Sequence, residues 1–339
     1  MHECVHNKLI NTRCARWGQK HVGSLRFARY CSLRIFARYA SVICLKGFFD
    51  LSKSDRKVIR GEKHHWWPKS LSNYWADEKG LVYRIDVSGK VIPSKPKEFG
   101  SISDGHNLLF QGRSSWESTI EGYFDKPDRS MKSVVSFLNS VIEREKEGTF
   151  EVDDIDKDML NLSKECLISL LVRSPRYRSG ISSLIESLRG EIPKADGKSL
   201  ISSNMNQKYK FLLKKSLNAG KLLILYSESD EFIYGDGLFS NLTVNTHDFS
   251  NFYSLVPFTP SLSLAWSVPR EYRSKPEITS AILNSEQVKL INNSTQIYSK
   301  EYLFFRSQHP ELLEEFRVNE HLKYRDIINP VSSIIRNYN

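Results

Sequence analysis

The sequence predicts an α+β fold for residues 61–339, with an N-terminal helix and β-hairpin, central helices, and C-terminal antiparallel strands with closing helices. Three observations predict it. Apolar residues recur at helical spacing in the first half, and apolar runs of strand length dominate the second half. No regular alternation of strand and helix, the pattern of a parallel α/β sheet, connects the halves. No low-complexity linker interrupts this region, so we expect a single domain.

A short helix and a hairpin are the first expected elements. "WWPKSLSNYW" at 66–75 places Pro68 near a first helical turn, and Gly80 follows its end. "LVYRIDVSGKVIPS" at 81–94 alternates apolar and polar residues around Ser-Gly, which is typical of a β-hairpin. Pro93 has no backbone N–H, so its strand is expected at a sheet edge.

Three helices are expected next, over residues 131–142, 151–174 and 181–188, each with apolar residues on one face. The second should end near Ser174, because a proline disfavours helical geometry in the residue before it. The second half predicts two pairs of strands at 221–237 and 252–268, then a helix and a short strand at 285–305. Residues 310–322 are expected to form the last sizeable helix.

The whole formal net charge of +10 lies in the first sixty residues, which carry thirteen basic and three acidic side chains. We expect residues 1–60 to be a basic N-terminal extension, either disordered or the product of a start codon assigned upstream of a true start near Val58. An arm that binds nucleic acid or anionic lipid and an organelle-targeting peptide are the alternatives. Nucleic acid is therefore expected as a partner only through residues 1–60. No apolar run is long enough for a transmembrane segment.

The adjacent histidines His64 and His65 are the first candidate site. Neighbouring side chains point in different directions, so one ring could act as a general base or metal ligand while the other packs. Alternatively both rings pack with the tryptophans that follow and bond to backbone groups. The cofactor stays open, and a divalent metal is compatible with this motif.

Arg173, Arg176 and Arg178 form the second candidate, because three guanidinium groups in six residues suit phosphate or carboxylate binding. The alternative is that they stabilise the C-terminal end of a helix. Asp236 in "YGDG" is the third, either as a metal ligand and proton acceptor or as an ordinary turn residue. Glu117 and Glu121, four residues apart, would share one helical face.

No phosphate-binding loop, dinucleotide fingerprint, zinc-protease motif or serine-hydrolase elbow is present. However, "HHWWPKSLSNYW" at 64–75, "RSPRYR" at 173–178 and "PFTP" at 257–260 together make residues 62–305 resemble the domain of unknown function 4238 family. "GDGL" departs from the family's usual "SDNP". The resemblance implies a bacterial, cytoplasmic protein and carries no established activity.

Two functions are expected. In the first, the chain is a hydrolase or nuclease acting on a phosphate-bearing substrate, with His64, His65 and Asp236 as catalytic residues and the three arginines binding the anion. In the second, it is a non-enzymatic module whose arginines hold an anionic ligand or partner while the histidines are structural. The sequence leaves open whether the protein is an enzyme.

Overall fold

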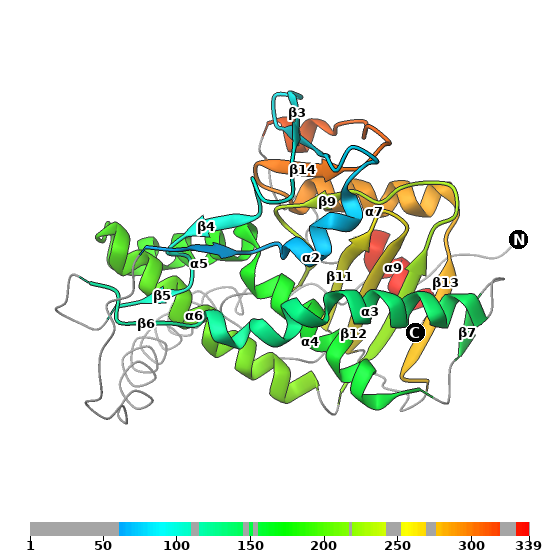
Figure 1. Ribbon diagram of the computed structural model, residues 1–339, viewed down its shortest axis with the longest axis horizontal. Coiled ribbons are helices and arrows are strands. Elements are labelled where there is room, and N and C mark those ends of the chain that lie inside the picture. Colours follow the sequence, from blue (N-terminus) through cyan, green and yellow to red (C-terminus); the bar gives the residue numbers. More distant parts are fainter. Residues whose placement is uncertain are drawn as a thin grey trace, which may run out of the picture. The chain divides into compact units, whose positions relative to one another are not determined.

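The computed structural model describes residues 61–109, 115–144, 149–151, 155–216, 219–241, 252–268, 276–318 and 330–338. The chain divides after Arg56, and all of these residues belong to the unit Lys57–Asn339. They form an α+β fold, as predicted (Figure 1). The predicted N-terminal extension, residues 1–60, lies outside the described residues.

Four helices make up the central part of this fold. They are α3 (Asp125–Arg144), α4 (Lys157–Arg173), α5 (Pro175–Arg189) and α6 (Lys194–Ser216). The first three confirm the predicted helices, although α4 starts later than predicted. The Asp156 carboxylate caps it by accepting the N–H groups of Asp158 and Met159.

The junction of α4 and α5 corrects the prediction for the arginines. Ser174 ends α4 and also begins α5, because its hydroxyl accepts the N–H of Tyr177 and Pro175 occupies the first helical position. Arg173 is therefore the last residue of one helix, whereas Arg176 and Arg178 lie among the first four residues of the next. Cations are favoured at a helix C-terminus and disfavoured at an N-terminus, so the helix dipole accounts for Arg173 alone.

Helix α6 was not predicted, although it is the longest helix among the described residues. Its buried face carries serines and a lysine beside its apolar residues, which hides the helical repeat of hydrophobic side chains. The buried residues of α6 are Ser199, Ser202, Met205, Lys208, Tyr209, Leu212 and Ser216.

The larger sheet among the described residues has the strand order β10-β11-β12-β8-β13-β7. Its strands are β7 (Thr149–Glu151), β8 (Lys221–Tyr226), β10 (Phe239–Ser240), β11 (Phe252–Thr259), β12 (Leu262–Val268) and β13 (Ile278–Ile282). The hairpin β11–β12 confirms the prediction for 252–268. Strands β8 and β13 run parallel, which corrects the prediction of antiparallel strands only. Strand β8 lies between β12, which is antiparallel to it, and β13, which is parallel to it.

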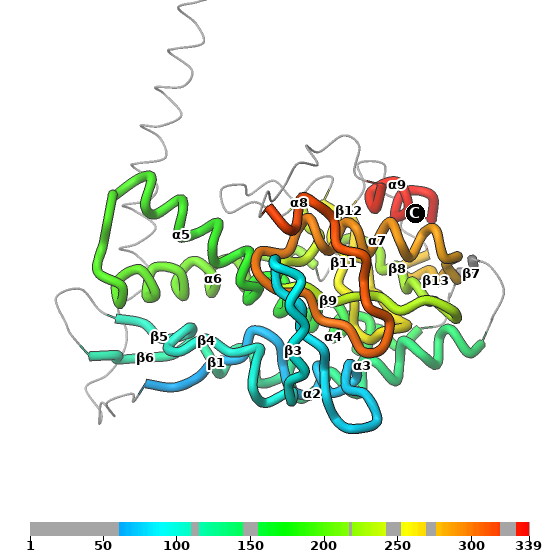
Figure 2. The backbone as a smooth tube through the Cα atoms, turned by 90° about the horizontal axis from the view of Figure 1, so that it is seen from above, coloured from blue at the N-terminus to red at the C-terminus, as the bar shows by residue number. Residues whose placement is uncertain are grey.

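Both faces of this sheet are covered. Strands β8, β11 and β12 are buried along nearly their whole length, as continuous apolar runs such as "KLLILY" predict. Helix α3 contacts β8 and α4 contacts β11. Figure 2 shows α3 on one side of the sheet and α9 (Pro330–Asn337) on the other.

A smaller antiparallel sheet has the order β3-β2-β14-β9. Its strands are β2 (Val82–Asp86), β3 (Val91–Ser94), β9 (Tyr234–Gly235) and β14 (Tyr302–Phe305). The predicted hairpin is confirmed as β2–β3, and β3 with its proline lies at the edge as expected. Two further antiparallel pairs join β1 (Lys63–His65) to β4 (Ser101–Ser103) and β5 (Asn107–Leu108) to β6 (Ser118–Thr119).

The remaining helices are short, apart from α7. They are α2 (Lys69–Ser72), α7 (Ser285–Tyr298), α8 (Glu314–Arg317) and α9, with 3-10 turns at Asn73–Trp75 and Glu121–Tyr123. In the predicted helix 310–322, only Glu314–Arg317 is helical within the described residues, and 319–322 lie outside them. The last helix of the described residues is the short α9 instead. None of the described helices is long and apolar enough to cross a membrane.

The tryptophans of "HHWW" belong to the core. Trp67 stacks on Tyr234 with ring centroids 4.0 Å apart and also packs against Trp75 and Phe304. These rings join the segment that follows β1 to the smaller sheet through apolar burial. The histidines before them have different partners.

Candidate functional site

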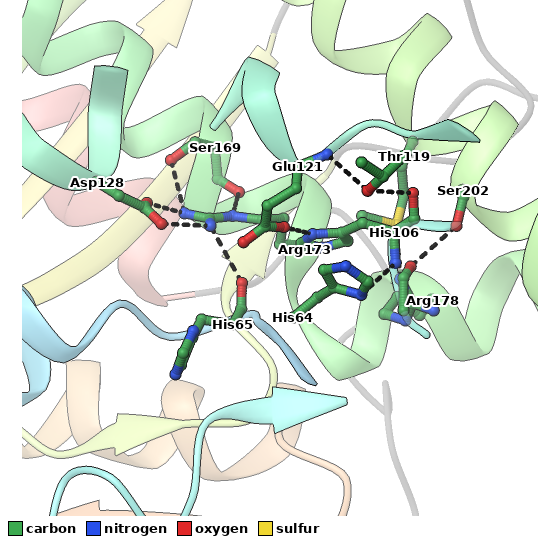
Figure 3. A network of polar contacts seen from close by, with 12 residues as sticks. His64, His65, His106, Thr119, Glu121, Asp128, Ser169, Arg173, Arg178 and Ser202 are labelled. Atoms are coloured by element: carbon green, nitrogen blue, oxygen red, sulfur yellow. Dashed lines mark hydrogen bonds and ion pairs between the residues drawn. The ribbon is translucent and has the colours of Figure 1, made fainter. Parts of the chain in front are cut away.

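His64 and His65 lie on opposite sides of strand β1, as the alternation of a strand requires. Only His64 is buried, and it enters the network of polar contacts in Figure 3. His65 contributes its backbone carbonyl, which accepts a hydrogen bond of 3.1 Å from Arg173. His64 therefore belongs to a buried polar network, whereas the His65 backbone fastens β1 to α4.

The two ring nitrogens of His64 have different surroundings. Nδ1 accepts the backbone N–H of His106 at 3.2 Å. Nε2 is fully buried and has no hydrogen-bond partner among the residues that the structure describes. The ring stacks on the ring of His106, with centroids 4.9 Å apart, rather than on the tryptophans as the structural interpretation had expected.

Sequence reasoning missed His106, and it considered its partner Glu121 only together with Glu117. His106 follows the turn at Asp104 and Gly105, and its Nδ1 bonds to the carboxylate of Glu121. Glu121 opens a 3-10 turn after β6, so the prediction that it shares a helical face with Glu117 is wrong. The turn before His106 was a readable local signal, but nothing in the sequence pairs this histidine with a glutamate fifteen residues away.

Burial shifts the pKa values of His64, His106 and Glu121. Both imidazole rings are only 2% exposed. Burial lowers the pKa of His64 and lowers the pKa of His106 well below its usual value, while burial raises the pKa of Glu121. Both rings are therefore neutral near pH 7.

Arg178 places a positive charge beside the histidines. Its Nη1 donates to the carbonyl of Gly105 at 2.8 Å and contacts the sulfur of Met205 at 2.9 Å. No carboxylate of the described residues forms an ion pair with it. Burial lowers its pKa to about 10, so the guanidinium keeps its charge at neutral pH. We call His64, His106, Glu121 and Arg178 the histidine cluster.

Arg173, in contrast, has no donor left for an anion. Its five N–H groups all donate, to the carboxylate of Asp128, the carbonyl of His65, and the carbonyl and hydroxyl of Ser169. Its guanidinium also stacks on Phe124 at 4.6 Å. It joins α3, α4 and β1, which is a structural use and speaks against the predicted anion-binding role.

Asp236 and Arg176 belong to a hydrogen-bond network separate from the histidine cluster. The buried Asp236 carboxylate accepts the backbone N–H groups of Lys300, Glu301 and Tyr302 and so closes the turn between α7 and β14. Arg176 donates its backbone N–H to the carbonyl of Asp236. Burial raises the pKa of Asp236 to about 6.

The flanking Gly235 and Gly237 serve packing at this turn. A Cβ at Gly237 would overlap the carbonyl of Tyr298. The expected catalytic pair of His64 and Asp236 is therefore divided between two networks, since every hydrogen bond of the Asp236 carboxylate goes to the 300–302 backbone.

The described residues show no metal site at the histidine cluster. Within the described part of the chain, no three His, Cys, Asp or Glu side chains are grouped to hold a metal ion. A cavity of about 320 Å³ lies elsewhere, between α3 and the ends of β8 and β13. It is lined by Asn139, Ile142, Glu143, Tyr226, Glu228, Ser261 and Ile282.

Comparison with known proteins found no matching family model, no matching curated protein and no matching solved structure. The resemblance to the domain of unknown function 4238 family therefore stays a prediction. Any function has to be argued from the geometry of the histidine cluster.

Proposed function

We propose that residues 61–339 act as a hydrolase on a phosphate-bearing substrate, a nuclease being one such enzyme, with His106 as the general base. The observation that carries this is the contact of His106 Nδ1 with Glu121. An ionised Glu121 holds the ring proton on Nδ1, so Nε2 presents a lone pair, and no described residue bonds to Nε2. A histidine oriented by a carboxylate is a common general base, because the carboxylate also stabilises the imidazolium that forms.

The low pKa of His106 suits a base that must be unprotonated at neutral pH. A water molecule would attack phosphorus and pass a proton to Nε2 as the P–O ester bond breaks. The leaving oxygen would then take a proton from solvent, and the His106 imidazolium would return its proton to solvent. Glu121 would remain hydrogen-bonded to Nδ1 throughout.

Arg178 supplies the anion contact in this proposal. It is a buried cation that has no carboxylate partner among the described residues, so a phosphate oxygen would provide the missing counter-charge. The earlier set of three arginines is thereby reduced to one at the cluster. The bacterial, cytoplasmic setting of this activity rests on the family resemblance alone.

The alternative is an anion-binding module without catalysis. The 2% exposure of both imidazole rings favours it, because buried, bonded histidines commonly fasten a fold. In that case Arg178 holds an anionic ligand or partner, and the cluster performs no proton transfer.

A hydrolysis assay on the full chain separates these functions. Release of p-nitrophenol from a phosphodiester and a phosphomonoester is followed with and without added Mg²⁺ or Mn²⁺. His106→Gln should lower kcat/KM by about 10²–10⁴-fold, the usual contribution of a general base. The matched control is His309→Gln, at an exposed histidine of the smaller sheet's border, which should leave the rate unchanged. Equal rates for parent and His106→Gln, or no hydrolysis together with phosphate binding, would favour the binding module.

A further inference from the structure

His64 is held in one tautomer by the backbone. The N–H of His106 can only donate, so Nδ1 of His64, which accepts it, carries a lone pair and no proton. The neutral ring must then carry its proton on Nε2. That N–H is fully buried and finds no acceptor in the described structure. Buried donors without acceptors are rare in native proteins and call for an explanation.

The two stacked rings consequently have opposite polarity. His106 presents a lone pair at Nε2 because its Nδ1 faces Glu121, whereas His64 presents an N–H at Nε2. The charge of Arg178 acts on both rings. An acceptor, a donor and a cation are thus gathered at one place (Figure 3).

We propose that the Nε2–H of His64 donates a hydrogen bond to an anionic oxygen of the phosphate-bearing ligand, and that His64 is neither a general base nor a metal ligand. This inference rests on the proposed function for the identity of the ligand. Both excluded roles would need a lone pair on Nε2, which moves the proton to Nδ1. There it would face the N–H of His106 across 3.2 Å, donor against donor.

Two substitutions separate the two nitrogen atoms of His64. The amide oxygen introduced by His64→Asn can replace Nδ1 and keep the bond from His106, but it offers nothing at Nε2. The amide nitrogen introduced by His64→Gln can replace the Nε2 donor, but it leaves the N–H of His106 without its acceptor. The pair therefore distinguishes a fastening role from a ligand-binding role within one side chain.

The experiment measures inorganic phosphate affinity and urea unfolding of the full chain for parent, His64→Asn and His64→Gln. We expect His64→Asn to retain the stability and to weaken phosphate binding about tenfold, the loss of one charge-assisted hydrogen bond. We expect His64→Gln to lower the stability and to bind phosphate within about threefold of the parent. Unchanged affinity in His64→Asn, or no phosphate binding by the parent, would overturn the inference.

Imidazole ¹⁵N NMR of the parent tests the same inference without substitution. The spectrum should show His64 protonated at Nε2, and added phosphate should shift that resonance. A proton on Nδ1, or a His64 signal that phosphate leaves unmoved, would contradict it. If phosphate binds at His64 but no ester is hydrolysed, the hydrolase proposal fails and this inference stands. If hydrolysis depends on His106 but phosphate does not bind at His64, only this inference fails.

Discussion

The ion pair of Arg173 and Asp128 should be the most costly polar contact to break. Arg173 is completely buried, and its shortest bond to the Asp128 carboxylate is 2.6 Å. Arg173→Met keeps an unbranched apolar stem but removes the guanidinium group, which leaves Asp128 unpaired and the carbonyl of His65 without its donor. Removing one partner of a buried pair costs about 3–5 kcal/mol of the free energy of unfolding. Because Asp128 is a quarter exposed, we expect the lower part of that range.

The double variant Arg173→Met/Asp128→Leu makes the reasoning sharper. It removes both charges, so only the unpaired carbonyl and imperfect packing remain, which together cost about 1–3 kcal/mol. The double variant should therefore be more stable than either single variant. Urea unfolding followed by tryptophan fluorescence measures all three. The control is Arg129→Met, which breaks an exposed ion pair on α3, the helix of Asp128. It should change the free energy of unfolding by less than about 0.5 kcal/mol. A loss below about 1 kcal/mol for Arg173→Met, or additive losses in the double variant, would refute the argument.

Two further perturbations follow from the cited pKa shifts and packing. His106 is held neutral, so the unfolded chain binds its proton first as the pH falls below 6.5, and stability is lost there. Asp236 has its pKa raised to about 6 from 3.8, so the folded state takes up this proton first and gains stability as the pH falls from about 6 to 4. In plots of the free energy of unfolding against pH, Asp236→Asn should thus steepen the loss of stability toward acid pH, and His106→Gln should make it shallower. Equal slopes for the two variants would contradict these assignments. Gly237→Ala should lower the free energy of unfolding by at least about 3 kcal/mol or prevent folding, because its Cβ meets the carbonyl of Tyr298. The control Gly122→Ala has open space around its Cβ and should change the melting temperature little. Similar melting temperatures for the two glycine variants would show that the Gly237 turn can relax.

Local patterns predicted much of the fold. Amphipathic repeats gave α3, α4 and α5, and the hairpins β2–β3 and β11–β12 followed from alternation and turn residues. Helix α6 was lost because Ser199, Ser202 and Lys208 occupy its buried face, where a periodicity argument looks for apolar residues. The parallel pairing of β8 and β13 depends on contacts between distant segments, which no local pattern encodes.

The candidate site was predicted only in part. His64 was identified because it belongs to a histidine pair, but its partner His106 and the Glu121 that contacts His106 come from separate turns and meet only in three dimensions. The arginines were misassigned because Pro175 was taken to end one helix, whereas it also starts the next. Asp236 was expected either as a metal ligand and proton acceptor or as an ordinary turn residue, and its carboxylate closes a turn.

The pH dependence of phosphodiester hydrolysis by the parent and by Glu121→Gln tests the central claim most directly. If His106 is the base and Glu121 orients it, the parent should lose activity only below pH 6.5, since burial lowers the pKa of His106. Glu121→Gln should reduce kcat/KM by about 10²-fold, because the amide cannot stabilise the imidazolium. A parent without hydrolytic activity, or a rate and pH profile that Glu121→Gln leaves unchanged, would contradict the account.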